Sequence, residues 1–97
     1  MSDAEVGLTW DEVKARVPVR SVVEGIVTAV PHYGVRLDLG VGFAGLMLIP
    51  EAGLEKGQRL DDHYRPGQRV TAYVLWHNDK EQQIWLTLNP AVLKEQT

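Results

Sequence analysis

The sequence predicts an all-β fold, a five-stranded Greek-key barrel with a short N-terminal helix and a helical turn between the third and fourth strands. Two observations predict it: five strand-length runs rich in apolar and β-branched residues, and glycines or prolines near most of their boundaries. Closing such a barrel removes most exposed strand edges. The runs are Val22–Val30, Gly34–Leu39, Phe43–Ile49, Arg69–Trp76 and Gln83–Leu88.

Length and charge narrow the class of protein. The 97 residues suffice for one domain with one hydrophobic core, and the absence of cysteine excludes disulfides and thiolate metal sites. Four of the thirteen acidic residues and no basic residue lie in the first twelve positions, so nine acidic and ten basic residues remain for the barrel. A protein that neutralises many phosphates should be more basic than this. The acidic N-terminus and the lack of a long apolar segment predict a cytoplasmic protein without a membrane partner.

A short helix is expected over residues 9–17, laid across one end of the barrel. Thr9 and Glu12 have the spacing of a capping box, in which hydroxyl and carboxylate satisfy each other's backbone amides. Apolar residues recur on one helical face from Trp10 onward, so Trp10 should anchor the helix by packing. Pro18 ends the helix because the residue before a proline avoids the α region.

The polar connection Glu51–Gln68 is the longest segment between strands. Pro50–Leu54 is expected to form a helical turn, since proline is tolerated at its start, and Pro66-Gly67 should close the connection as a type II turn. The resulting organisation is a flexible N-terminus over 1–8, one domain over 9–90, and a C-terminal tail over 91–97 that is too short to be stable alone.

Alternation predicts which strand residues face outward. Gly25, inside the first run, is typical of a bulge or of a coil at a barrel corner. Trp85 is expected on the outside, either available to a ligand or packed beneath the N-terminal helix or against Tyr73. In the last two runs, Val70, Ala72, Val74, Ile84, Leu86 and Leu88 should face inward and Thr87 outward.

These segments together resemble the S1 RNA-binding domain, the OB-fold repeat of the ribosomal protein S1 type. The order and spacing of all five agree with that family over about residues 10–90. The resemblance implies a module that binds RNA or single-stranded nucleic acid, is not an enzyme and needs no cofactor. Single-stranded RNA or DNA is then the expected partner, with messenger RNA or the ribosome as its source. The motifs that carry the resemblance are Gly25-Ile26-Val27, Tyr33–Gly40, Gly45–Glu51, Pro66–Val70 and Ile84–Leu88.

The resemblance also implies a half-buried His77, because the family has an apolar inward residue at that position, and it implies a binding face. Tyr33 keeps the family's aromatic residue before the glycine of the second strand. The family's second aromatic is replaced by Arg36, its histidine by Leu48, its aspartate by Asn78 and its arginine by Gln83. Four of five positions therefore differ, and weak binding is expected. With the outward Trp85, the predicted nucleic-acid-binding residues are Tyr33, Arg36, Leu48, Asn78, Gln83 and Trp85.

An alternative function is protein–protein interaction on an OB-fold that has lost RNA binding. The near-neutral charge, the altered positions and the apolar Leu48 and Trp85 favour it, because exposed apolar surface usually marks a partner site. A positive stripe formed by Arg20, Arg36 and Arg69 beside Tyr33 would instead favour RNA.

Neither a metal site nor a catalytic centre is expected. His32, His63 and His77 lie in separate segments without the spacing of a metal motif. Asp61-Asp62-His63 is a local acidic cluster that reads as a solvated turn. The sequence also lacks the Gly-x-Ser-x-Gly motif of a nucleophile elbow.

Overall fold

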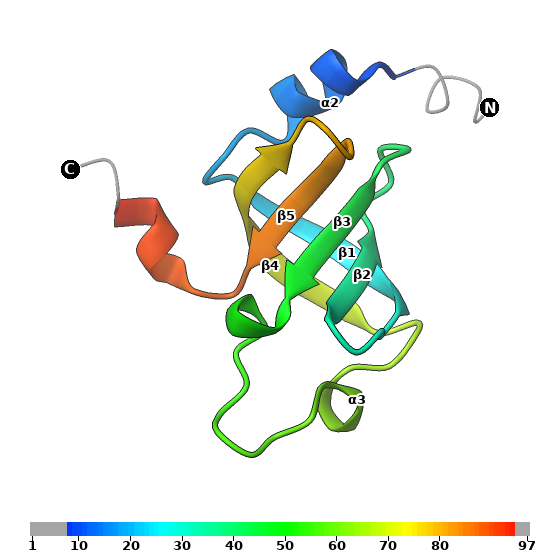
Figure 1. Ribbon diagram of the computed structural model, residues 1–97. Coiled ribbons are helices and arrows are strands. Elements are labelled where there is room, and N and C mark those ends of the chain that lie inside the picture. The colour runs from blue at the N-terminus through cyan, green and yellow to red at the C-terminus, as the bar shows by residue number, and fades with distance from the viewer. Residues whose placement is uncertain (1–7, 95–97) are drawn as a thin grey trace.

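The computed structural model describes residues 8–94, which form a closed barrel with the strand order β1-β2-β3-β5-β4 (Figure 1). β3 and β5 pair in parallel and close the barrel, while the other neighbouring strands are antiparallel. The predicted five-stranded OB-fold barrel is confirmed. The strands are β1 (Val22–Ala29), β2 (Gly34–Asp38), β3 (Ala44–Leu48), β4 (Arg69–Asn78) and β5 (Gln83–Thr87).

The helix α2 (Trp10–Arg16) lies at one end of the barrel (Figure 1). Its predicted capping box is present: the Glu12 amide donates to Thr9 Oγ1 at 3.1 Å, and the Thr9 amide donates to Glu12 Oε1 at 2.9 Å. The Trp10 ring lies 5.2 Å from the Phe43 ring between centroids, and its Nε1 donates to Asp79 Oδ1 at 2.7 Å. Trp10 therefore anchors the helix, as predicted.

His77 is half-buried beneath α2, also as predicted. Its Nε2 lies 2.8 Å from the carbonyl oxygen of Val17, and its ring meets the Trp10 ring edge to face at 6.2 Å. The imidazole is thus a packing and hydrogen-bonding group that joins β4 to the end of the helix.

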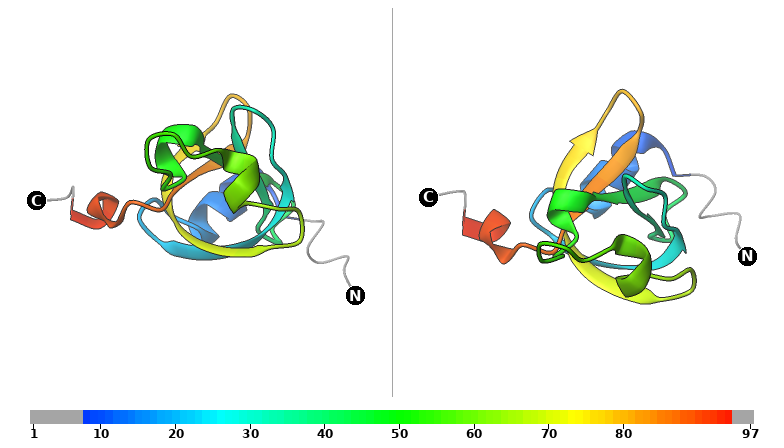
Figure 2. Two further views of the ribbon diagram at one scale, coloured as in Figure 1. Left: turned by 90° about the horizontal axis from the view of Figure 1, so that it is seen from below. Right: turned by 60° about the horizontal axis from the view of Figure 1, so that its bottom comes forward.

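The connection between β3 and β4 covers the opposite end of the barrel (Figure 2). It contains the 3-10 helix η1 (Ile49–Glu51) and the one-turn helix α3 (Leu60–His63). The predicted helical turn exists, but it spans Ile49–Glu51 instead of Pro50–Leu54. α3 was not predicted, because four residues are too few for a helical period to show. It is held by tertiary burial, since Leu60 is only 8% exposed.

Tyr64 follows α3 and fixes the connection to η1. Its buried hydroxyl donates to the carbonyl oxygen of Ala52 at 2.7 Å, and burial raises the pKa of the phenol. We expect Tyr64→Phe to lower the free energy of unfolding by about 1 kcal/mol, because the Ala52 carbonyl loses its donor while the ring still fills its site. Urea denaturation measures the change. Tyr73→Phe, on the outer side of β4, is the matched control and should change stability less.

Two details of the strands differ from what was expected. Of the two expectations for Gly25, a bulge or a coil at a barrel corner, the bulge is wrong, because the β1 register shifts between Val27 and Ala29 instead. Gly25 gives β1 room to approach β2, because a Cβ there would lie 2.7 Å from Leu39 Cδ2. Thr87, expected to face outward, is covered there: it is 1% exposed and donates to Glu51 Oε1 at 2.6 Å. The η1 side chain thus reaches over the end of β5, which strand alternation alone does not reveal.

The ends of the described segment pack against the barrel. Residues 1–7 of the predicted flexible N-terminus lie outside the described residues, but Leu8 packs against the hydrophobic core. The 3-10 helix η2 (Pro90–Lys94) follows β5, and its Val92 is 5% exposed. The first residues of the predicted tail therefore form η2, which is anchored by the buried Val92. Within residues 8–94, no helix has the length and apolar character needed to cross a membrane.

Candidate nucleic-acid interface

One outward side chain from each of four neighbouring strands forms a row across the barrel. Arg36 on β2 pairs with Leu46 on β3, Leu46 pairs with Trp85 on β5, and Trp85 opposes Trp76 on β4. We call these four residues the outer row. The outward direction of Arg36, Leu46 and Trp85 follows from alternation, because the flanking residues Val35, Leu37, Met47, Ile84 and Leu86 belong to the hydrophobic core.

Leu46 shows that the outer row is itself packed. It is 6% exposed, yet it does not belong to the interior cluster. Its register neighbours on the same face are Arg36 and Trp85, and neighbouring strands lie only about 4.8 Å apart. The aliphatic part of Arg36 and the Trp85 indole are therefore placed to cover it.

Tyr33 extends this face just before β2. Its side chain is exposed, and its hydroxyl accepts a hydrogen bond from Arg36 Nη1 at 3.1 Å. The His32 ring meets the Tyr33 ring edge to face, with centroids 5.4 Å apart. The predicted aromatic platform and its guanidinium neighbour are therefore in direct contact.

The other predicted residues lie at the two ends of the same face. Leu48 opposes Gly34 near Tyr33 and is half-buried. Asn78 opposes Gln83 at the β4–β5 hairpin, and Trp85 Nε1 donates to Gln83 Oε1 at 3.4 Å. All six predicted residues thus belong to the outer face of β2, β3, β5 and β4, although all of them except Tyr33 are only partly exposed.

Trp76 is the large residue on this face that the sequence analysis did not include. Continued alternation from Val74 would turn Trp76 inward, but the register shifts between Val74 and Trp76 and turns it outward, where it is 50% exposed. Trp85 packs against Trp76, with ring centroids 5.0 Å apart, and not against Tyr73 or the N-terminal helix. The only signal in the sequence is the apolar pair Val74-Leu75, which breaks the alternation.

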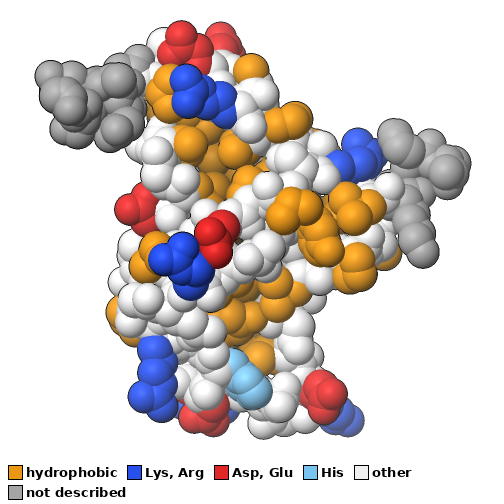
Figure 3. Space-filling model, turned by 180° about the vertical axis from the view of Figure 1, so that it is seen from behind, with side chains coloured by type: hydrophobic (Ala, Val, Ile, Leu, Met, Phe, Trp, Pro, Cys, Tyr) orange, Lys and Arg blue, Asp and Glu red, His pale blue; other side chains and the backbone are white. Residues whose placement is uncertain are grey.

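The basic residues do not form the stripe that was considered beside Tyr33. The Arg20 amide donates to the carbonyl of Val74, which places it before β1 and against β4. Arg69 opposes Ile26 and pairs with Glu24 Oε1 at 3.3 Å. On the face opposite β3 and β5, Lys and Arg are scattered among Asp and Glu (Figure 3). Arg36 is thus the basic member of the outer row.

Near the β4–β5 hairpin, the positive charge of Lys14 is also balanced by acidic side chains. Its Nζ lies 2.8 Å from Asp79 Oδ1 and 3.8 Å from Asp11 Oδ1. The hydrogen bond from Lys14, with a second from Trp10, lowers the pKa of the Asp79 carboxyl, and the same pairing raises the pKa of Lys14. Lys14 therefore adds little net positive charge beside the outer row.

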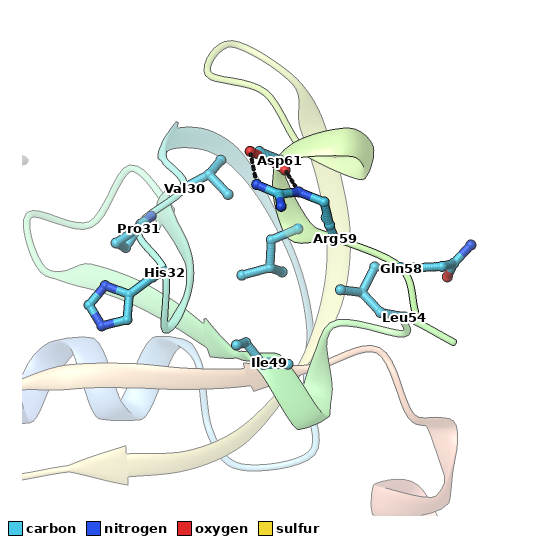
Figure 4. Close-up of a pocket in the computed structure, with 9 residues that line it drawn as sticks. Val30, Pro31, His32, Ile49, Leu54, Gln58, Arg59 and Asp61 are labelled. Atoms are coloured by element: carbon cyan, nitrogen blue, oxygen red, sulfur yellow. Dashed lines mark hydrogen bonds and ion pairs between the residues drawn. The ribbon is translucent and has the colours of Figure 1, made fainter. Parts of the chain in front are cut away.

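An open pocket of about 400 Å³ adjoins the Tyr33 end of the face (Figure 4). It lies between the β1–β2 loop, η1 and the β3–β4 connection, and Val30, Ile49 and Leu54 supply apolar walls. Arg59 at its rim donates to both carboxylate oxygens of Asp61, at 3.1 and 3.2 Å, and lowers the pKa of that carboxyl. The one guanidinium in the lining is therefore already neutralised.

Asp61 is thus an ion-pair partner in the segment that was expected to be a solvated turn. Among residues 8–94, no three His, Cys, Asp or Glu side chains come together in a way that could hold a metal ion. The three histidines are separated: His32 precedes β2, His63 ends α3, and His77 lies beneath α2.

A closed five-stranded barrel with aromatic and basic groups on one outer face is typical of OB-fold modules that bind nucleic acid. The family model for the S1 RNA binding domain matches residues 11–88. The chain therefore belongs to the S1 RNA binding domain family.

Similar proteins agree with this assignment. The small ribosomal subunit protein bS1 of Helicobacter pylori is 31% identical over 78 residues, and that of Chlamydia trachomatis is 27% identical over 79 residues. These matches cover 80% and 81% of this chain but 14% of each relative's length. The solution structure of GSP13 from Bacillus subtilis has a TM-score of 0.64 and 26% identity, covering 81% of this chain and 58% of that one.

Proposed function

We propose that this chain is a cytoplasmic module that binds short single-stranded RNA, weakly and with little sequence preference, on the outer face of β2, β3 and β5. The observation that carries the proposal is the placement of Tyr33, Arg36 and Trp85 on one face of an S1-family barrel. By analogy with the bS1 relatives, messenger RNA or ribosomal RNA is the natural source of such a ligand.

The chemistry of the face suits stacking better than phosphate binding. Tyr33 and Trp85 offer aromatic surfaces, which stack on any base because every base has a π face. The Arg36 guanidinium can stack on a base or donate to a phosphate, and the bond to Tyr33 holds it in place. Because Arg36 is the basic residue of the outer row, few phosphates are neutralised, and affinity should be low.

A fluorescence titration with a single-stranded RNA of about eight nucleotides at low salt tests the proposal. We expect tryptophan emission to be quenched and affinity to fall only gently with salt, because the slope is about −0.7 per neutralised phosphate for single strands. Absence of both quenching and binding at tens of micromolar protein would refute it. A steep slope would show general electrostatic attraction instead of a stacking face.

A matched pair of arginine variants locates the interface. Arg36→Ala should weaken RNA binding about five- to tenfold, as expected when one stacked or charge-assisted contact is lost. Arg69→Ala removes the same charge from a side chain paired with Glu24, away from the outer row, and should leave affinity nearly unchanged. Fluorescence anisotropy with labelled RNA measures both. Equal losses in the two variants would contradict the assigned face.

Protein binding is the second candidate function, and the exposed apolar surface of Trp76 is the observation that favours it. Capture of partners from a cell extract, with and without ribonuclease, distinguishes the two functions. If the chain binds RNA, partners captured through RNA should be lost after ribonuclease treatment. Partners that survive nuclease treatment and are lost with Trp76→Ala would favour the protein-interaction function.

A further inference from the structure

We infer that Trp76 is a second stacking site, which takes one nucleobase beyond those bound on β2, β3 and β5 and so extends the RNA path onto β4. This inference rests on the proposed function, because the same RNA strand would cross the outer row before it reaches Trp76. It adds a ligand contact on β4, the strand on which Asn78 is the residue predicted from the sequence to bind nucleic acid.

The first observation is the bulge that turns Trp76 outward. The β4–β5 register shifts between Val74 and Trp76, and without that shift the indole would point toward the barrel interior. Bulges are over-represented next to functional sites, where they redirect a side chain. Half of the Trp76 surface is exposed, an unusual state for so large an apolar side chain on a strand.

The second observation is the geometry of the indole pair. Trp76 and Trp85 lie 5.0 Å apart between centroids, with their planes inclined at 65°. An edge-to-face pair covers at most one of its four ring faces, whereas two stacked rings would cover two. The contact with Trp85 therefore fixes the orientation of Trp76 while leaving indole surface open to a base.

The third observation is continuity. Trp76 ends the outer row, which begins at Arg36 and crosses β2, β3, β5 and β4 in adjacent register positions. Strands about 4.8 Å apart place the ends of this row roughly 14 Å from each other, less the curvature of the barrel. A single strand lying across the row would thus meet Arg36, Trp85 and Trp76 in turn.

Oligonucleotide length provides the test. Labelled oligouridylates of three to eight nucleotides are titrated by anisotropy with the unmodified chain, Trp76→Ala, Trp76→Phe and Leu93→Ala. Leu93, a similarly exposed apolar residue on η2, serves as the matched control. We expect the affinity of the unmodified chain to rise about tenfold when the oligouridylate becomes one nucleotide longer at one particular length, at which a base first reaches Trp76. This rise is the length step. Trp76→Ala should lose that step, Trp76→Phe should retain most of it, and Leu93→Ala should retain all of it.

A second readout keeps the inference separate from the proposed function. In the double variant Trp10→Phe and Trp85→Phe, Trp76 is the sole indole, and its emission should be quenched only by the longer oligouridylates. If RNA binds in an Arg36-dependent way but the length step survives in Trp76→Ala and the sole indole is not quenched, the inference is overturned while the proposed function stands. If no oligouridylate binds the unmodified chain, both fail.

Discussion

Gly34→Ala should destabilise the barrel by about 3 kcal/mol, at the upper end of the range for overpacking in a well-packed site. A Cβ at Gly34 would lie 2.5 Å from the carbonyl oxygen of Met47 and 3.0 Å from Leu48 Cα. These are backbone atoms of β3, so no side-chain rotation relieves the clash and β2 must move away from β3. Thermal and urea unfolding measure the loss of stability.

Gly45→Ala is the control for this substitution, because it makes the same chemical change in the same pair of strands. The atoms nearest to a Cβ at Gly45 would be side-chain atoms of Leu86 and Leu39, at 3.1 and 3.2 Å, and these side chains can shift. Its cost should be clearly smaller than that of Gly34→Ala. Equal costs would show that close backbone approach at Gly34 is not what requires glycine there. Gly34 lies between Tyr33 and Arg36 in the sequence, so a shift of the backbone at Gly34 would disturb both side chains. Gly34→Ala should therefore also weaken RNA binding.

Trp85→Ala should reduce affinity for single-stranded RNA more than any other single change on the face, by about tenfold or more. It removes a stacking surface, whose loss costs about 1–3 kcal/mol per base, and it uncovers Leu46. It also removes the partner that orients Trp76. Anisotropy with labelled RNA measures affinity, and circular dichroism verifies that the barrel is intact.

Two further variants separate stacking from general effects on the fold. Trp85→Phe keeps an aromatic face and should retain most of the affinity. Trp10→Phe changes an indole that is not part of the outer row, because it packs against Phe43 and bonds Asp79, and this variant should bind RNA normally. Unchanged RNA affinity in a correctly folded Trp85→Ala variant would remove Trp85 from the interface.

The strands were predictable from sequence because their apolar residues alternate and their ends carry glycine or proline. Val35 and Leu37 point inward around Arg36, and this alternation is sufficient to place Arg36 on the outside. The contact between Arg36 and Tyr33 could not be predicted in the same way. It depends on how the chain enters β2 and on side-chain rotamers, which a pattern of residue types does not specify.

The features that were missed arise from interactions distant in sequence. Thr87 is buried because Glu51 reaches it from η1, and α3 forms because Leu60 is buried against the barrel. The bulge before Trp76 adds one residue to β4 relative to β5, which is a property of the pairing of two strands and not of either alone. An analysis of alternation in single strands cannot detect any of these.

The parallel contact between β3 and β5 has a consequence for any ligand of this face. In the described part of the chain these strands meet through two register pairs, Gly45 with Ile84 and Leu46 with Trp85, whereas every other neighbouring pair of strands shares three or more. The β3–β5 seam is therefore the junction of the barrel with the fewest register pairs. A ligand bound over Leu46 and Trp85 would contact both strands of this seam. Ligand binding would therefore stabilise the closed barrel, and the closed barrel would favour ligand binding.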